Sequence, residues 1–366
     1  MNRIPLNVMN FAQGKTDFYE ALPDFVNHYR AEHYKANVSY DKSLNFAEKT
    51  QKMHDALLKE IKRHANVSTS EEFSLETQST NPMFVWATFA VIDAAIDMII
   101  PQTIIDSIGV YSDVRQGGFT DSFAFDVKPR DLFAVTKGSM GKRHGEIQQQ
   151  YDGQVTLTPI VHDVTVGVDL YRVLAGYENL AEFLMKATRS IETQMSYDAY
   201  VAMNTAATAL PTTPTDGELK ISGYTQSDAI RLAQSVSAFN MGIEAVFCGT
   251  KSALSNILPN DANYRYDLQS DYVKIGYIRT AFGYDTMAFP QIADWKTPFK
   301  LLLDDTRIYV VSPSSQKIVK VCLGGNTIAI DGGVYGMANL KHVTTLKKKW
   351  ICGVATNSVM GLIIVS

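Results

Sequence analysis

Cysteine is scarce in this chain, which has three in 366 residues. Cys248, Cys322 and Cys352 lie far apart, each in an apolar or strand-like stretch, and none belongs to a Cys-x-x-Cys pair. We therefore expect small buried hydrophobic side chains in a reducing cytoplasm rather than a disulfide framework.

A strong excess of charge is also lacking, since the formal net charge is -4. The densest basic run is Lys347 to Lys349, preceded by Lys341 and His342. This gives little support to sequence-specific nucleic-acid binding, although weak contact with bystander nucleic acid is compatible with this charge. A hydrophobic fraction of 46% with 20% charged residues is typical of a folded protein, and the length favours two or more compact units or one unit with large extensions.

The N-terminal stretch lacks the apolar segment of a signal peptide, and we expect no membrane span. Residues 83–100 are nearly long enough for one, but Asp93 and Asp97 would lie on one helical face and each would cost a few kcal/mol in a bilayer. We expect a helix buried against protein, capped by Asn81 and Pro82 and ended by Pro101.

Motifs of catalysis are missing as well, and we expect no enzyme, cofactor or metal. The sequence GTKS at 249–252 fails the phosphate-loop pattern and predicts a short capped helix. The pair Gly324 and Gly325 does not make a dinucleotide fingerprint and indicates a turn between strands, while adjacent Asp304 and Asp305 point apart. Four of the seven histidines lie near the N-terminus without zinc-site spacing, and we expect them to face solvent or a partner: His28, His33, His54 and His64.

The first part of the chain is helical and aromatic. Residues 41–66 predict an amphipathic helix whose apolar face comprises Leu44, Ala47, Leu57, Leu58 and Ile61. Aromatic residues recur before it and suggest a segment that docks on something: Phe18, Tyr19, Phe25, Tyr29, Tyr34 and Tyr40.

Next comes a polar, glycine-punctuated stretch, LFAVTKGSMGKRHGEIQQQYDG at 132–153, between two runs that alternate with period two. The apolar positions of the run before this stretch are Phe119, Phe123, Phe125 and Val127, and those of the run after it are Val155, Leu157 and then Val164 to Leu170. Together they predict a long two-stranded hairpin with a polar tip. Because a bare ribbon is marginal in water, it requires a partner.

A long helix follows, with an apolar stripe at a spacing of three or four. Asn179 is its expected cap, with Glu182 as the reciprocal partner. Its length is on the order of 40 Å, which makes it a spine for the fold. The stripe is formed by Leu180, Leu184, Ala187, Ile191, Met195, Ala199 and Ala202.

The segment PTTPTDG at 211–217 breaks this helix as a hinge or domain boundary. Beyond it we predict an α/β alternation, with a helix at 225–239 and a short helix from Thr250. Strands are expected at 243–248, 272–278, 284–289, 299–303 and 307–311, and then in KIVKVCL, NTIAI, WICGVAT and GLIIV.

This order of elements resembles the major capsid proteins of tailed phages, the Hong Kong 97-like α+β fold shared with encapsulin shells. FTDSFAFDVKPRDLFAVTKGSMGKRHG looks like the outgoing strand and tip of that family's extended loop, and LAEFLMKATRSIETQMSYDAYVAMNTA looks like its spine helix. YVVSPSSQKIVKV and WICGVATNSVMGLIIVS look like strands of its domains. The resemblance covers roughly residues 80–366.

The resemblance implies a domain plan: a helical arm at 1–110, an extended loop at 111–170, a peripheral domain at 171–210 and 335–366, and an axial domain at 211–334. It implies self-assembly into hexamers and pentamers of an icosahedral shell around double-stranded DNA, built in the host cytoplasm and located in the virion capsid. Implied partners are further copies, a portal, scaffold or decoration proteins and, without sequence specificity, the packaged DNA.

The loop tip carries the implied contacts with a neighbouring subunit, through Lys137, Lys142, Arg143, Gln148 and Gln149. Some family members cross-link a loop lysine to an asparagine, for which Lys137 or Lys142 and Asn339 or Asn357 are the analogues here. Because no glutamate follows Glu244, the acid of that pattern is missing from its expected place.

Other classes of protein remain open at this point. The first is an encapsulin-type compartment, although such shells typically use a shorter chain. The others are a soluble cytoplasmic α/β enzyme whose site forms only in three dimensions, and a phage adaptor or tail component that binds other structural proteins.

Overall fold

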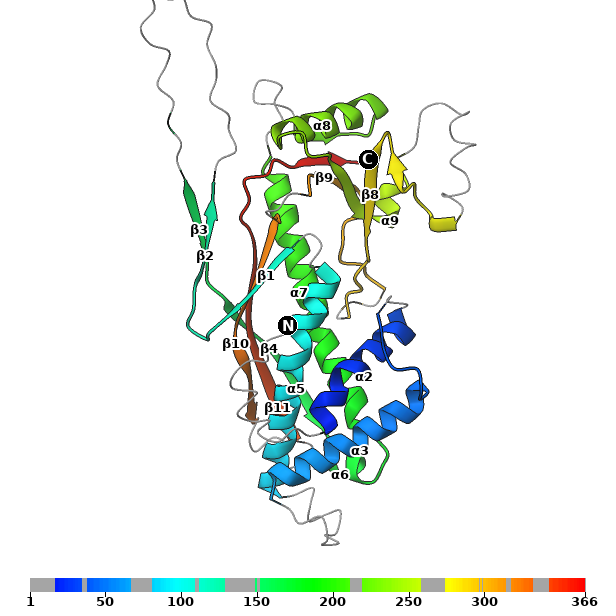
Figure 1. The fold of residues 1–366 in the computed structure, drawn as a ribbon, viewed down its shortest axis with the longest axis vertical. Helices are drawn as coiled ribbons and strands as arrows, with labels where there is room; N and C mark the ends of the chain where they lie inside the picture. Colours follow the sequence, from blue (N-terminus) through cyan, green and yellow to red (C-terminus); the bar gives the residue numbers. More distant parts are fainter. Residues whose placement is uncertain are drawn as a thin grey trace, which may run out of the picture.

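The longest helix, α7 (Leu180–Thr208), runs through both lobes of the molecule, and a two-stranded ribbon stands beside them (Figure 1). The computed structural model describes residues 17–34, 38–66, 81–108, 112–128, 149, 152–210, 219–257, 274–295, 297, 299–313, 317–331 and 342–365. The lower lobe is built on a four-stranded sheet and the upper lobe on a six-stranded sheet.

Helix α7 confirms the spine prediction. The side chain of Asn179 accepts hydrogen bonds from the backbone N–H groups of Ala181 and Glu182, which satisfies two donors that a helix leaves open at its first turn. Its buried stripe follows the expected spacing and includes Leu184, Ile191 and Met195. Helix α6 (Leu170–Leu174), capped by Asp169, immediately precedes it.

Helix α5 (Pro82–Ile108) is the apolar helix of the lower lobe, and Asn81 caps it through a bond from the Met83 N–H (2.9 Å). The prediction that Pro101 ends this helix is wrong, because the helix continues past it. A proline inside a helix costs about 3 kcal/mol, and here burial of Ile99, Ile100 and Ile104 offsets that cost. By length and composition the part from Pro82 to Pro101 could cross a membrane, but 72% of it is buried inside the protein.

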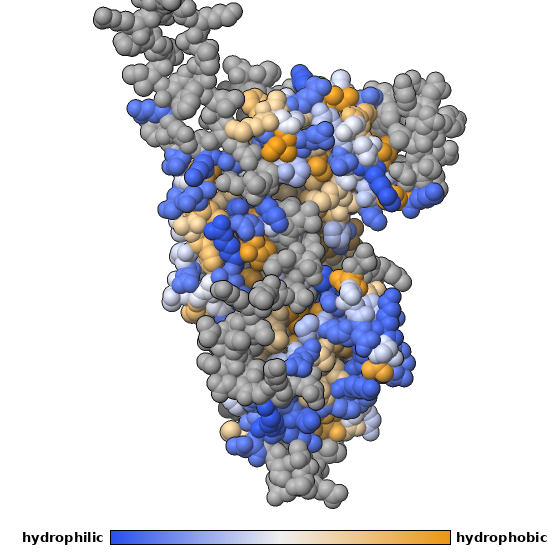
Figure 2. Space-filling model, in the orientation of Figure 1, coloured by the Kyte–Doolittle hydropathy of each residue, from blue (hydrophilic) through white to orange (hydrophobic). Residues whose placement is uncertain are grey.

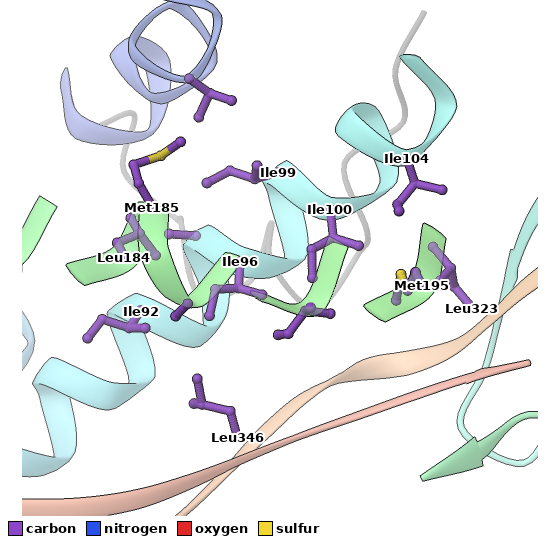
Figure 3. Packing of buried hydrophobic residues seen from close by; sticks show 14 of the residues in the cluster. Ile92, Ile96, Ile99, Ile100, Ile104, Leu184, Met185, Met195, Leu323 and Leu346 are labelled. Carbon is purple, nitrogen blue, oxygen red and sulfur yellow. The ribbon is translucent and has the colours of Figure 1, made fainter. Parts of the chain in front are cut away.

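Figure 3 shows where that burial occurs, with isoleucines of α5 pointing at α7 and at the sheet. Ile92, Ile96 and Ile100 face Leu184 and Met195 of α7, and Leu323 and Leu346 lie on the strands beneath. Because the side chains of the two helices and the sheet interlock, α5 and α7 are fixed against one face of the sheet.

The N-terminal helices α2 (Asp17–Tyr34) and α3 (Phe46–His64) pack on α5, and α3 also contacts α7. The helix expected at 41–66 is confirmed, but it runs from Phe46 to His64 after its cap Asn45, so Leu44 lies outside it and Ala47 is exposed. Phe18 and Phe25 are buried, so the aromatic segment docks on its own chain.

The lower sheet has the strand order β1-β10-β11-β4, with β1 parallel to β10 and the other pairs antiparallel. Its strands are β1 (Ser112–Gly117), β4 (Ile160–Val168), β10 (Val319–Asp331) and β11 (His342–Val354). The predicted pairing of the Val164 run across the hairpin is wrong, because β4 pairs with β11. KIVKVCL and NTIAI form one strand rather than two, with an irregularity between Gly324 and Ile328 in place of a turn.

The upper sheet has the strand order β5-β12-β9-β6-β8-β7. These strands are β5 (Lys220–Ser222), β6 (Val246–Thr250), β7 (Thr280–Ala281), β8 (Tyr284–Phe289), β9 (Arg307–Val311) and β12 (Gly361–Ile364). Helix α8 (Gln226–Phe239) lies across its top, and α9 (Lys251–Leu254) follows β6 with Thr250 as cap, as GTKS predicted. Residues 274–278 and 299–303 are not strands; the latter contribute only an isolated bridge between Ala293 and Leu301.

Candidate assembly surfaces

The ribbon consists of β2 (Phe123–Val127) and β3 (Gly153–Leu157), paired antiparallel from Phe123 opposite Leu157 to Val127 opposite Gly153. It leaves the lower sheet and rises beside the upper lobe (Figure 1). A two-stranded ribbon buries too little surface to be stable alone. Its position therefore depends on what its root contacts.

The root of the ribbon packs on the face of the lower sheet that α5 and α7 leave open. Phe125 is buried against Cys322 and Ala355, and the guanidinium of Arg115 lies 4.1 Å from the Phe125 ring centroid. An arginine over an aromatic face contributes about 0.5–1 kcal/mol at exposed sites. This small apolar cluster is the ribbon's anchor within its own chain.

A glycine permits the close approach of ribbon and sheet. A Cβ atom on Gly353 of β11 would lie 2.8 Å from Leu157 Cδ2, closer than packed carbon atoms approach. The same holds for Gly117, where a Cβ would lie 2.8 Å from the Phe123 ring. The ribbon root thus rests directly on backbone.

Polar contacts fix the direction in which the ribbon leaves. The Asn357 side-chain amide donates to the backbone carbonyl of Lys128 (2.6 Å), and Lys349 Nζ donates to the carbonyl of Phe119 (2.9 Å). Lys349 also lies 3.7 Å from the centroid of the Phe119 ring. The chain is thus bound just before β2, at Phe119, and just after it, at Lys128, by residues from the C-terminal part of the sequence.

Most of the residues proposed for the tip lie outside the described residues: Lys137, Lys142, Arg143, Gln148 and Asn339. Gln149 is described and exposed. Asn357 is at the ribbon root, where its amide already binds the ribbon of its own chain. Contact of the tip with a neighbour therefore stays a prediction.

A buried ion pair joins α5 to the sheet, and sequence reasoning missed it. Lys348 Nζ lies 2.5 Å from Asp97 Oδ1, with side-chain exposures of 1% and 4%. Asp97 also accepts the N–H (2.9 Å) and hydroxyl (2.6 Å) of Thr327, and Lys348 donates to the Gly325 carbonyl. A carboxylate within the most apolar stretch of this helix was the available signal, since a buried charge requires a partner.

This pair changes the interpretation of the basic run at 347–349. Lys348 points into the core and Lys349 onto Phe119, so the three lysines do not form one exposed patch. Lys348 and Lys349 instead bind elements of the lower lobe together.

His54 corrects the expectation that the N-terminal histidines face solvent or a partner. It is buried, and its Nδ1 accepts the backbone N–H of Leu180 (3.0 Å) at the start of α7. Burial lowers the pKa of His54, although Asp55 opposes the shift, so the neutral acceptor form is favoured. His28 is buried too, stacked on Tyr40 with 4.3 Å between ring centroids.

A second histidine ties the edge strand β4 to the spine. The His162 ring lies flat on Trp350, with 3.7 Å between centroids, and Trp350 Nε1 donates to Asp198 Oδ2 of α7 (2.8 Å). Asp198 also accepts from Gln194 (2.8 Å). Three elements distant in sequence meet at one carboxylate.

The two lobes are joined by a polar cluster where β9 crosses α7. The Tyr309 hydroxyl donates to Asn204 Oδ1 (2.8 Å) and lies 3.2 Å from the Tyr200 hydroxyl. Arg307 donates to Asn204 Oδ1 (2.6 Å) and to Asp304 (2.7 Å). Asp305 instead accepts from Thr250 (2.5 Å), so the two adjacent acids point apart as expected.

Reactive chemistry is weak in the described part of the chain. Burial raises the pKa of the Cys248 and Cys322 thiols to about 12, and burial also raises that of Cys352. Such thiols are poor nucleophiles at neutral pH. Among the described residues, no three His, Cys, Asp or Glu side chains are grouped to hold a metal ion.

No protein-family model and no curated protein matches the sequence, but solved structures match the fold. The capsid of a native GTA particle is 11% identical, over 71% of this chain and 90% of that chain, with a TM-score of 0.50. The capsid of an empty GTA particle matches at 11% identity over 71% and 89%, with a TM-score of 0.46. The mature capsid of bacteriophage PhiM1 matches at 11% over 70% and 86%, with a TM-score of 0.45.

The fold is thereby placed in a class. The likeness to the native GTA capsid, together with a ribbon, a spine helix and two lobes, defines the α+β Hong Kong 97-like capsid fold. The fold prediction made from the sequence is confirmed.

Proposed function

We propose that this chain is the major capsid protein of a tailed phage, which assembles through hexamers and pentamers into an icosahedral shell around double-stranded DNA. The observation that carries the proposal is the fold, shared with the capsid of the native GTA particle over 71% of this chain. The ribbon supports it, because a two-stranded ribbon anchored only at its root gains stability by lying on another subunit.

The proposal includes a division of labour along the chain. Residues 1–110 are the helical arm, 111–170 the extended loop, 171–210 with 335–366 the peripheral domain, and 211–334 the axial domain. Within 111–170, the strands that leave the lower sheet are β2 and β3, whereas β1 and β4 pair inside it.

The tip of the loop binds a neighbouring copy through Lys137, Lys142, Arg143, Gln148 and Gln149. Cross-linking of Lys137 or Lys142 to Asn339 or Asn357 is the less favoured extension, since Asn357 is occupied by Lys128. Further proposed partners are the portal, scaffold or decoration proteins and, without sequence specificity, the packaged DNA. The shell assembles in the host cytoplasm and becomes the virion capsid, and no catalysis is proposed.

Negative-stain microscopy of the purified protein tests the function. We expect hollow icosahedral particles. Monomers or dimers at high protein concentration would contradict it, rings or tubes of fixed rotational order would indicate an adaptor, and shells that enclose a cargo enzyme would indicate an encapsulin-type compartment.

Shortening the ribbon tests the role of the loop. Replacing residues 129–151 with an Asn-Gly turn keeps the described strands β2 and β3 and their root, so we expect a folded protein by circular dichroism. Because the part that reaches a neighbour is gone, closed shells should be lost. A full-length variant with alanine at Lys137, Lys142, Arg143, Gln148 and Gln149 keeps the length of the loop and removes only these side chains, so it tests their contacts separately from the loop's length. Closed shells formed by the shortened chain would contradict the proposal.

A further inference from the structure

A hairpin, described by the structure except at residues 296 and 298, connects β8 to β9 at the lower end of the upper sheet (Figure 1). Its arms are joined by bonds from the Leu302 N–H to the Ile292 carbonyl (2.8 Å) and from the Asp294 N–H to the Lys300 carbonyl (2.8 Å). The side chain of Gln291 closes its base by accepting the Leu303 N–H (2.9 Å). We call residues 291–302 the aromatic hairpin; Lys296 and Pro298 lie outside the described residues.

The tip of the aromatic hairpin displays large apolar side chains. Trp295 is 86% exposed and Phe299 106% exposed, and Leu301 is 52% exposed. Phe299 also has a φ of 62°, a left-handed conformation that bulky residues avoid at a cost of about 1–3 kcal/mol. The Phe299 side chain thus faces solvent on a strained backbone and does not pack in the core of its own chain.

A second turn combines the same features at the end of α8. Phe239 is 60% exposed and Met241 59% exposed, and Met241 has a φ of 61°. Asn240 between them is fully buried and fixes the backbone: it donates to the Val236 and Val359 carbonyls (both 2.8 Å) and accepts the Val359 N–H (2.9 Å). We call residues 239–243 the α8 turn, and Figure 2 shows hydrophobic surface among hydrophilic residues over α8.

The aromatic hairpin and the α8 turn lie at opposite ends of the upper sheet. The α8 turn precedes the start of β6, and its Ile243 carbonyl accepts the hydroxyl of Ser312, which follows the end of β9. The hairpin follows the end of β8 and precedes the start of β9, and β6 and β8 are parallel. Strands of five residues separate the two surfaces by about 17 Å.

We propose that the aromatic hairpin of one copy packs on the α8 turn of the next copy around a ring. This inference rests on the proposed shell function. Two different surfaces at opposite ends suit a head-to-tail contact, because every copy then offers one surface to each neighbour, and such contacts form a ring where the rotation between copies closes.

The size of the contact favours a second copy of this chain. Trp295 and Phe299 would bury on the order of 150–250 Å² each, and together with the α8 turn this falls short of the roughly 1,200 Å² of a lone stable interface. Such a contact is effective when it is repeated around a ring and combined with others.

Cross-linking tests the juxtaposition. A Phe299→Cys, Met241→Cys double variant, assembled and treated with a short bismaleimide, should give a ladder of covalent oligomers on denaturing gels up to the ring size. Each single variant is the background control: Cys248 and Cys322 are buried, and any reaction through half-buried Cys352 would appear in the single variants as well. Shells without a ladder would overturn the proposal, whereas a wild-type protein that never leaves the monomer would contradict the shell function instead.

A strain-relieving variant tests the energetic argument. Phe299→Gly combined with Trp295→Ala removes the two exposed aromatic side chains of the hairpin, while glycine adopts the positive φ freely. We expect the concentration needed for assembly to rise at least tenfold without a lower melting temperature, and Thr297→Ala on the same hairpin to leave both unchanged. Unchanged assembly of the double variant, or a lowered melting temperature in it, would overturn the proposal.

Discussion

The two lobes differ in what they bury. Among the described residues, every buried histidine, lysine, aspartate and glutamate belongs to the lower lobe: His28, Lys49, His54, Glu60, Asp97, Lys320 and Lys348. The buried polar residues of the upper lobe, such as Asn240 and Ser312, are neutral. Both lobes expose large apolar side chains, such as Trp86 in the lower lobe and Trp295 in the upper lobe. The lower lobe is therefore held by buried charged groups, whereas the described part of the upper lobe is held without them.

Breaking the Asp97 contact should have the largest effect on this difference. Asp97→Ala leaves Lys348 buried without a counter-charge and the Thr327 N–H without an acceptor. Removing one partner of a buried pair costs about 3–5 kcal/mol. We expect a loss of that size in the free energy of unfolding, measured by denaturant titration.

The matched control removes both charges. Asp97→Leu with Lys348→Met fills the same space with apolar atoms, and such replacements are often neutral. The part of the loss that comes from the unpaired Lys348 should therefore return, whereas the Thr327 N–H still lacks its acceptor. A loss under about 1 kcal/mol in the single variant would mean that the lower lobe does not depend on this pair.

Tyr309→Phe probes the joint between the lobes, with a smaller effect. The variant removes the hydroxyl that donates to Asn204, but Arg307 still binds that amide oxygen. We expect a loss of about 1 kcal/mol in calorimetric unfolding. Exposed Tyr177→Phe is the control, and equal losses in both variants would exclude a specific role of the joint.

The smallest effect at neutral pH should come from His54, and it should grow in acid. In the unfolded chain histidine titrates near pH 6.5, and burial lowers the pKa of His54 in the folded protein. The unfolded state therefore binds more protons below pH 6.5, so stability is full above that pH and is lost as the pH falls toward the folded pKa.

His54→Asn keeps an acceptor for the Leu180 N–H but does not titrate. Unfolding titrations between pH 7 and pH 5 should show a shallower decline for this variant than for the wild type. His33→Asn, at an exposed position, should retain the wild-type slope. Identical slopes in all three proteins would show that His54 does not cause the loss of stability in acid.

Local signals predicted much of the fold. The apolar stripe of α7 and the helix caps Asn179 and Asn81 depend on residues nearby in the sequence, so they could be predicted from the sequence alone. Pro101 was misjudged because the burial that offsets its cost comes from α7 and the sheet. The same reason hid Asp97 with Lys348 and His54 with Leu180, pairs separated by 251 and 126 positions. The joining of KIVKVCL and NTIAI likewise depends on β11, which pairs with both.

The position of β12 has a consequence for timing in the cell. This strand lies between β5 and β9, so the upper sheet stays divided until residues 361–364 have been synthesised. Pairings this distant in sequence also form slowly. Until that part of the chain has folded onto the sheet, Asn240 of the α8 turn also lacks its partner Val359. A subunit therefore completes the α8 turn late in its folding, which separates the early folding of a subunit from its recruitment into a growing ring.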